Sequence, residues 1–507
     1  MAASFIDKDR QVIPQWRFLT PSRRNSEALP IGGEASQPLV SRHLADLLSE
    51  WRSSRTLTLA CELVSAAYAA GDKDAAIDAA ELIIKSHSPE PLAVKLAEIY
   101  LLNPNEIPTP SVAYSNWTLR DELNSQIQNL RREVKAYPCD PLRWANLSRA
   151  WLALGLGDKA QRAMNVAACL APENRLIVRA RSRLLLHTEG PESALRYLRG
   201  RPTLKTDPWI LSAEVATALA ASKTPAHFKT ARRIIDTDRF APVHSSELAS
   251  AIGTMYAKDG SHKLSRKLIR KSLVRPSENA LAQAKWLARN IPEVALESNQ
   301  RDPLTAYEAY AWTMLAEHKY KDSIEAAKSW LHDQPFSSRP SVFGSFYASR
   351  MLEDHEVALN FADNGLLSNP QDCTLRNNRA FCLANLGRVV EAADEIQKAL
   401  PLAARVEDRI AVIATGGLIA YRSNDLATGE MLYHKAIEVA GKFGKRDYVL
   451  TARMYDTIER IRIGLPYSIK LADQVLKEVR ESHPKADIAM VADLLEKKLL
   501  EAKIAVV

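Results

Sequence analysis

One short string in the sequence has the spacing of a dinucleotide-binding loop, Gly155-x-Gly157-x-x-Ala160. In dinucleotide-binding enzymes this string follows a β-strand and opens a helix, so that backbone N–H groups face a pyrophosphate. Here the string falls between two segments with helical periodicity, where glycine suits a turn and alanine suits close packing. We therefore expect no cofactor at this position.

Other residue types that act as nucleophiles or metal ligands also lack catalytic spacing. The 11 histidines contain no H-E-x-x-H pair, and Gly441-Lys442-Phe443-Gly444-Lys445 lacks the spacing of a phosphate-binding loop. The 5 cysteines contain no C-x-x-C pair, and we expect them to be small buried hydrophobes. The sequence thus predicts no catalytic, metal or cofactor residues. The alternative is an enzyme whose catalytic residues are dispersed along the chain, and no sequence motif supports it.

Length and composition favour an array of helices. A chain of 507 residues is too long for one compact core, and it has only 18 glycines and 7% aromatic residues. It opens on a polar segment and contains no long uncharged apolar run. We expect a soluble, cytoplasmic protein with no membrane partner.

A unit of 34 residues is visible from Pro141 to Asn174. Large, small and helix-ending residues recur in it at fixed spacing, namely Trp144, Leu147, Ser148, Trp151, Gly155, Ala160, Met164, Ala167 and Pro172. This stretch resembles the tetratricopeptide repeat family, with Ser148 in place of the usual Gly, Trp151 for Tyr and Met164 for Phe.

The spacing has a physical reason. Two antiparallel helices need a small residue on each where they cross, and Ser148 and Ala160 supply it. Gly155 suits the left-handed turn that ends the first helix, and Pro172 ends the second. Alanine recurs in the same register further along the chain, at Ala194, Ala358 and Ala392, and Gly253 with Gly260 marks another unit.

The resemblance implies an all-α fold, a right-handed α-solenoid of tetratricopeptide-like helix hairpins. We expect an extended N-terminal arm over residues 1–40, an N-terminal solenoid over 41–300, and a C-terminal solenoid over 301–507 that ends in a capping helix. The segment Ile291 to Pro303 is the expected boundary between the two solenoids. In the arm, Trp16 and Phe18 are expected to dock, either on a partner or on the first repeats of their own chain.

Positive charge is concentrated between Arg175 and Arg275. This block contains 20 Lys and Arg but only 8 Asp and Glu, in a chain whose net charge is +8. The candidate basic patch comprises Arg149, Arg179 and Arg183, which the resemblance places on the concave face, and Lys263, Arg266, Lys267, Arg270 and Lys271 on an outward helix. Such a patch suits an acidic protein partner or a phosphate backbone, and a merely solvated basic face is the alternative.

Three aromatic residues, Trp312, Tyr347 and Phe381, occupy the same repeat column in successive units. Together with Phe343, Asn377 and Asn378 they are the candidate partner-binding groove, suited to an extended peptide or a helix. The alternative is that these rings pack between units as core.

The sequence therefore predicts a non-enzymatic scaffold or adaptor that binds one or more proteins, with a sensor or regulator of an associated effector as a variant. A nucleic-acid-binding helical-repeat protein that uses the Arg175 to Arg275 block is the alternative function. The partner, the pathway and the oligomeric state do not follow from the sequence.

Overall fold

The computed structural model describes residues 10–18, 39–70, 72, 74–86, 94, 97–98, 100–101, 119–237, 240–295, 306–465, 467–482 and 486–506. Throughout these ranges the regular secondary structure is helical, and no strand occurs in them. This confirms the predicted all-α fold. The chain forms two compact units, one over Thr20–Asp121 and one over Met1–Leu19 with Glu122–Val507. We call them the insert and the main unit.

The insert contains α2 (Leu39–Ser53), α3 (Leu57–Ala70) and α4 (Ile77–Lys85). Trp51, Leu63 and Ile83 lie in their shared core. The Tyr100 hydroxyl donates a hydrogen bond of 2.6 Å to the carbonyl of Asp72 and accepts one of 3.2 Å from the N–H of Ala76. These bonds hold the turn before α4.

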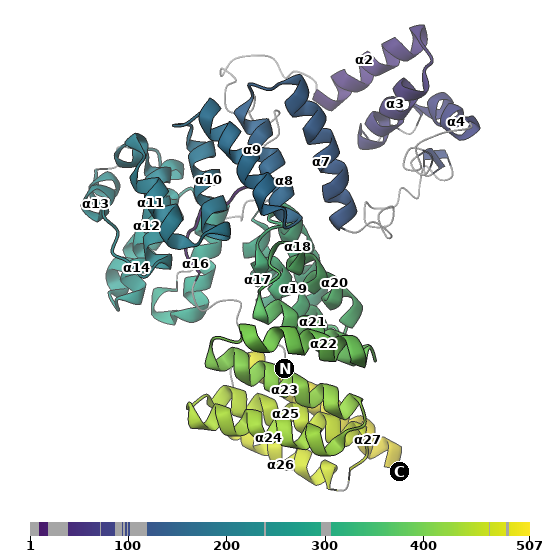
Figure 1. Ribbon diagram of the computed structural model, residues 1–507, viewed down its shortest axis with the longest axis vertical. Helices are drawn as coiled ribbons and strands as arrows, with labels where there is room; N and C mark the ends of the chain where they lie inside the picture. Colours follow the sequence, from purple (N-terminus) through teal and green to yellow (C-terminus); the bar gives the residue numbers. More distant parts are fainter. Residues whose placement is uncertain are drawn as a thin grey trace. The chain divides into compact units, whose positions relative to one another are not determined.

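The main unit is a succession of helices that Figure 1 shows as neighbouring pairs. Its first part comprises α7 (Leu119–Ala136), α8 (Pro141–Ala153), α9 (Gly157–Leu170), α10 (Arg175–Thr188), α11 (Pro191–Arg199), η1 (Pro202–Lys205), α12 (Pro208–Ala220), α13 (Phe228–Asp236), α14 (Pro242–Lys258), α15 (His262–Ser272), α16 (Glu278–Asn290) and η2 (Pro292–Val294). Its second part comprises α17 (Tyr307–Ala316), α18 (Tyr320–Asp333), α19 (Ser338–Met351), α20 (His355–Ser368), α21 (Cys373–Asn385), α22 (Val389–Ala399), η3 (Leu400–Leu402), α23 (Val406–Arg422), α24 (Leu426–Lys442), α25 (Arg446–Arg462), α26 (Ser468–Glu481) and α27 (Ala486–Val506).

The helices of the main unit pair as hairpins, for example α8 with α9, α14 with α15, α19 with α20 and α23 with α24. The first helices of successive hairpins also contact one another, as α10 does α12, α12 does α14, and α21 does α23. A row of first helices in mutual contact forms the inner side of a curved stack. The main unit is therefore an α-solenoid of tetratricopeptide-like hairpins, as the repeat pattern predicted.

The small residues predicted at the helix crossings lie at the crossings. Ala160, Ala194, Ala358 and Ala392 have no exposed surface. Gly344 on α19 shows most clearly that a crossing needs a small residue, because a Cβ there would lie 2.4 Å from the ring of Phe361 on α20. A methyl group at this position would force the two helices apart.

Buried serine hydroxyls join the two helices of a hairpin at the same level. Each serine donates to a backbone carbonyl twelve residues away, which satisfies a polar group that close packing has removed from water. The bonds are Ser148 to Ala160 at 2.7 Å, Ser265 to Gly253 at 2.8 Å and Ser323 to Ala311 at 2.8 Å.

Two hairpins far apart in the sequence meet inside the main unit. Gly155, in the turn between α8 and α9, has a φ of 74° and lies so near α20 that a Cβ there would be 2.2 Å from the carbonyl oxygen of Leu367. His187 on α10 donates through Nε2 to the carbonyl of Ser368 at 3.1 Å. These contacts join the parts before and after residue 301 into one compact unit. The division in the structure thus falls around the insert, whereas the sequence placed it near residue 300.

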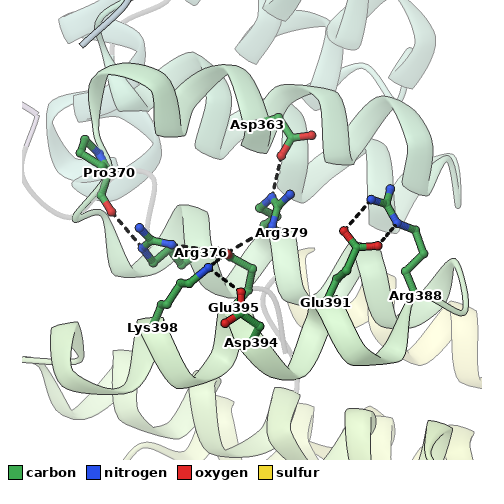
Figure 2. Close-up of polar contacts among 9 residues, drawn as sticks. All are labelled: Asp363, Pro370, Arg376, Arg379, Arg388, Glu391, Asp394, Glu395 and Lys398. Carbon is green, nitrogen blue, oxygen red and sulfur yellow. Dashed lines mark hydrogen bonds and ion pairs between the residues drawn. The ribbon is translucent and has the colours of Figure 1, made fainter. Parts of the chain in front are cut away.

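Charged side chains link α20, α21 and α22 in a network that Figure 2 shows. The buried carboxylate of Glu395 accepts from Arg376 at 2.9 Å and from Lys398 at 3.1 Å. Arg379 lies 3.2 Å from the same carboxylate and donates to Asp363 on α20 at 2.6 Å. A buried carboxylate with three cations around it fixes the register of neighbouring hairpins.

Candidate functional site

Residues 10–18 form an extended segment inside the main unit, which we call the arm. It is the purple segment among the blue and teal helices of Figure 1. Arg10, Val12 and Trp16 are buried. An extended chain of this length spans roughly 26 Å, and the arm contacts α16 and α17 at one end and α7 and α8 at the other. The rest of the predicted arm up to residue 38 lies outside the described residues.

The side chain of Arg10 fills a polar pocket between α16 and α17. Its guanidinium donates to both carboxylate oxygens of Glu308, from Nε at 2.8 Å and from Nη2 at 2.9 Å. It also donates to Gln283 Oε1 at 2.6 Å and to Asn279 Oδ1 at 3.0 Å. A pocket that offers four acceptors to one planar guanidinium is specific for arginine. The single ammonium of lysine does not reproduce these bonds.

Glu308 is fully ionised in this pocket. Burial alone would raise the pKa of its carboxyl, but Arg10 and Arg339 stabilise the charged form and hold the pKa at about 2. The Arg339 Nη2 atom donates to Glu308 Oε1 at 2.7 Å. The arm therefore supplies one of two cations that a buried carboxylate needs.

The groove also binds the backbone of the arm. Amide and guanidinium groups of the helices donate to three arm carbonyls: Gln283 to Arg10 at 3.0 Å, Asn279 to Ile13 at 2.9 Å, and Arg149 to Trp16 at 3.1 Å. Because backbone carbonyls are common to all peptides, these bonds fix the course of an extended segment without reading its sequence.

Apolar pockets receive the side chains between these polar contacts. Trp16 lies against the ring of Phe336, with centroids 5.6 Å apart. Arg183 lies over that ring, 4.9 Å from its centroid. Val12 belongs to the core of α10 to α15, and Phe18 packs against the core of α7 and α8. Trp16 and Phe18 thus pack against helices of their own chain in this structure.

A second arginine of the arm, Arg17, lies between two carboxylates. It is 2.8 Å from Glu278 on α16 and 3.0 Å from Asp333 at the end of α18. Burial raises the pKa of the Asp333 carboxyl, while Arg17 and Arg149 oppose that shift. The groove thus presents carboxylates to both arginines of the arm.

The three arginines expected on the concave face take part in internal contacts. Arg149 donates to the carbonyls of Trp16 and Asp333, the latter at 2.6 Å. Arg179 donates to Glu247 at 2.8 Å and lies over the ring of Trp209. Burial lowers the pKa of both Arg149 and Arg183 to about 10. In this structure Arg149 therefore contacts the arm, and Arg179 and Arg183 contact other residues of the main unit.

The basic residues expected on an outward helix are on α15. Lys263, Arg266, Lys267 and Arg270 are exposed there, whereas Lys271 is half-buried and donates to the carbonyl of Ile235. The structure therefore divides the predicted patch into an internal set and an exposed set.

The six residues of the predicted aromatic groove lie in the packed interior and are all buried: Trp312, Phe343, Tyr347, Asn377, Asn378 and Phe381. The Trp312 ring meets Phe343 edge on, with centroids 4.6 Å apart. Asn378 donates to the hydroxyl of Ser345 on the preceding first helix at 3.0 Å. In this arrangement the rings and amides contact one another between repeats.

Sequence reasoning did not find the residues that contact the arm most closely. Asn279 and Gln283 are four residues apart on a first helix, so both amides face the same side. That spacing was the available signal for a backbone-binding strip. Glu308 and Asp333 carried no such signal, since single carboxylates are common on helices.

The described residues contain no group of three or more His, Cys, Asp or Glu placed to hold a metal. No helix among them is long and apolar enough to cross a bilayer. Cys373 and Cys382 are buried, as expected of small hydrophobes, but Cys139 and Cys169 are exposed, so the expectation is wrong for those two.

No protein-family model matches the chain, and no curated protein matches it at a significant level. Among solved structures the chain is similar to the APC/C hetero-tetramer Cut9-Hcn1, with 12% identity over 91% of this chain and 87% of that one, at a TM-score of 0.40. It is also similar to the human IFIT1 dimer with PPP-AAAA, with 12% identity over 92% and 96% of the two chains, at a TM-score of 0.32.

Proposed function

We propose that this chain is a non-enzymatic scaffold that holds partner proteins, in part through extended segments laid against its first helices. The observation that carries the proposal is the arm itself. The inner row of helices already binds a peptide-like segment, through three backbone carbonyls and through pockets for arginine and tryptophan side chains. A surface with those contacts has the chemistry of peptide recognition.

Two buried titratable groups near the groove, Glu308 and His187, support a structural role over a catalytic one. Glu308 is held ionised by two arginines, and burial lowers the pKa of His187 to about 4, so that its ring is neutral. Away from the groove, on α21, burial raises the pKa of the Cys382 thiol to about 12. A catalytic acid, base or nucleophile needs a pKa near the working pH, and these shifts lead away from it.

The exposed basic residues of α15 supply a second contact surface in this proposal, suited to an acidic partner. Nucleic acid is the less favoured ligand, because Arg149, Arg179 and Arg183 of the predicted basic patch make contacts within the chain. A phosphate-binding mode would also lose affinity steeply as salt rises.

Cross-linking of the full chain in its native cell tests the scaffold. A photoreactive residue at position 267 on α15 should give cross-links to one or a few proteins in stoichiometric yield. The double variant Arg266→Glu with Lys267→Glu should lose partners held by charge. Lys321→Glu with Lys328→Glu on α18 is the matched control, and it should retain them. A chain that captures no protein at stoichiometric yield, and instead shifts a DNA or RNA probe in low salt, would overturn the scaffold in favour of nucleic acid binding.

A further inference from the structure

We propose that the groove recognises extended basic and aromatic segments, in which an arginine is followed six residues later by an indole, and that the arm is a built-in competitor for this site. A partner segment of that chemistry displaces the arm and takes its place. This inference rests on the proposed scaffold function and names the class of partner for one surface of it.

The charge of the groove selects a basic segment. Glu308, Glu278 and Asp333 face Arg10 and Arg17, and a segment without cations would leave the buried Glu308 with Arg339 as its remaining close cation. Removing the partner of a buried charge is strongly unfavourable. The groove therefore differs from α15, whose exposed lysines and arginines suit an acidic partner.

The contacts divide into a general part and a specific part. The bonds from Asn279, Gln283 and Arg149 go to arm carbonyls, so any extended segment on the same course retains them. Specificity comes from the four-acceptor pocket around Arg10 and from the aromatic pocket around Trp16. The spacing between those two pockets sets the six-residue interval.

The arm is an imperfect occupant of its own groove. The indole N–H of Trp16 and the side-chain oxygen of Gln11 are buried, and neither has a hydrogen-bond partner among the residues that the structure describes. A buried polar atom without a partner weakens binding. A tethered segment tolerates that loss because its effective concentration is about millimolar. A free segment that satisfies or omits those atoms has the higher intrinsic affinity.

The experiment uses the full chain with a protease site placed between residues 19 and 38. Cutting the folded protein converts the arm into a separate fragment and removes its tether. A fluorescent peptide of residues 8–19 is then added to cut and uncut protein, and its anisotropy is measured. The cut protein should exchange its fragment for the peptide, and the uncut protein should bind it about 100-fold more weakly, since the tether is intact.

Peptide variants test the two pockets. Replacing Arg10 with alanine should weaken binding to the cut protein by at least about 100-fold. Replacing Trp16 with benzothienylalanine, which has the same shape but no N–H, should strengthen binding about 5-fold or more. A peptide in which Gln15 is replaced by alanine is the matched control, because the Gln15 side chain is only part-buried, and it should bind nearly as the parent does.

Three results would overturn the inference. They are absence of exchange in the cut protein, equal binding by cut and uncut protein, and loss of the far-ultraviolet helical signal when the fragment leaves. The last result would make the arm a structural element. If cross-linking still captures protein partners while the peptide fails to exchange, the scaffold function is retained, and the proposal that the arm competes with partner segments is rejected.

Discussion

The guanidinium of Arg10 is paired with the carboxylate of Glu308, 298 residues further along the chain, through bonds of 2.8 and 2.9 Å. Both side chains are buried, and Arg339 shares the carboxylate. The pair joins the first described residue of the chain to α17, and with Gln283 it joins α16 as well. One side chain thus ties together two helices on opposite sides of residues 296–305.

Replacing Arg10 with alanine should lower the free energy of unfolding by about 3 kcal/mol, because it leaves a buried carboxylate with one cation fewer. Urea denaturation followed by circular dichroism measures the change. Arg266→Ala on α15 is the control, and its exposed side chain should contribute less than about 0.5 kcal/mol. Equal effects of the two variants would show that the arm pocket adds nothing to stability.

Adding a methyl group to a glycine should lower the stability of the fold where two helices cross, but not where the added group meets open space. In Gly344→Ala the new Cβ would lie 2.4 Å from the Phe361 ring, which predicts a loss of about 1 to 3 kcal/mol. Gly441→Ala near the end of α24 meets nothing within 4 Å and should be neutral or stabilising by up to about 1 kcal/mol. Thermal melts of both variants compare them, and a Gly344→Ala protein as stable as the parent would mean that the hairpin separates easily.

Replacing Trp312 tests whether the column of aromatic rings is core or a ligand-binding surface. Its ring contacts Phe343 and Tyr347, and Arg289 lies 3.5 Å from its centroid. Trp312→Ala should therefore lower the free energy of unfolding by about 3 to 5 kcal/mol. Tyr310→Ala on the same helix removes a side chain that is 46% exposed and should have a small effect. Should Trp312→Ala keep full stability and lose a bound partner, the ring column would be a binding surface.

Stability should fall as the pH drops from 7 to 4, in part through His187. Burial and, to a lesser extent, Arg183 lower its pKa to about 4 in the folded chain, from the ordinary value of 6.5. Between those values the unfolded state binds the proton and the folded state does not, so acid favours unfolding by up to about 3 kcal/mol. His187→Leu should flatten this dependence in urea denaturation at several pH values. The exposed His434→Leu should keep the slope of the parent, and an unchanged slope in His187→Leu would contradict the assignment.

Local features of the solenoid could be predicted from the sequence because each depends on neighbours within one hairpin. Gly155 adopts the left-handed turn, Ala160 lies at a crossing, and the helices begin and end near the predicted residues. A repeat unit touches only the next unit, so a pattern 34 residues long contains most of the information needed to specify it.

The groove could not be predicted in the same way. Its contacts join Arg10 to Glu308, Arg149 to Asp333 and Trp16 to Phe336, and no periodicity links residues so far apart. The resemblance placed Arg149 on the concave face, but the sequence did not show that its guanidinium would bind the arm backbone. The sequence analysis also placed residues 41–300 in one solenoid, whereas contacts separate Thr20–Asp121 as a unit.

The separation of Arg10 from Glu308 along the chain has a consequence for synthesis. At about 5 to 20 residues per second, a ribosome needs roughly 15 to 60 s to make the intervening stretch. During that time the arm has emerged but half of its binding surface does not yet exist. Nascent chains should therefore expose Val12, Trp16 and Phe18 until α16 and α17 have been made.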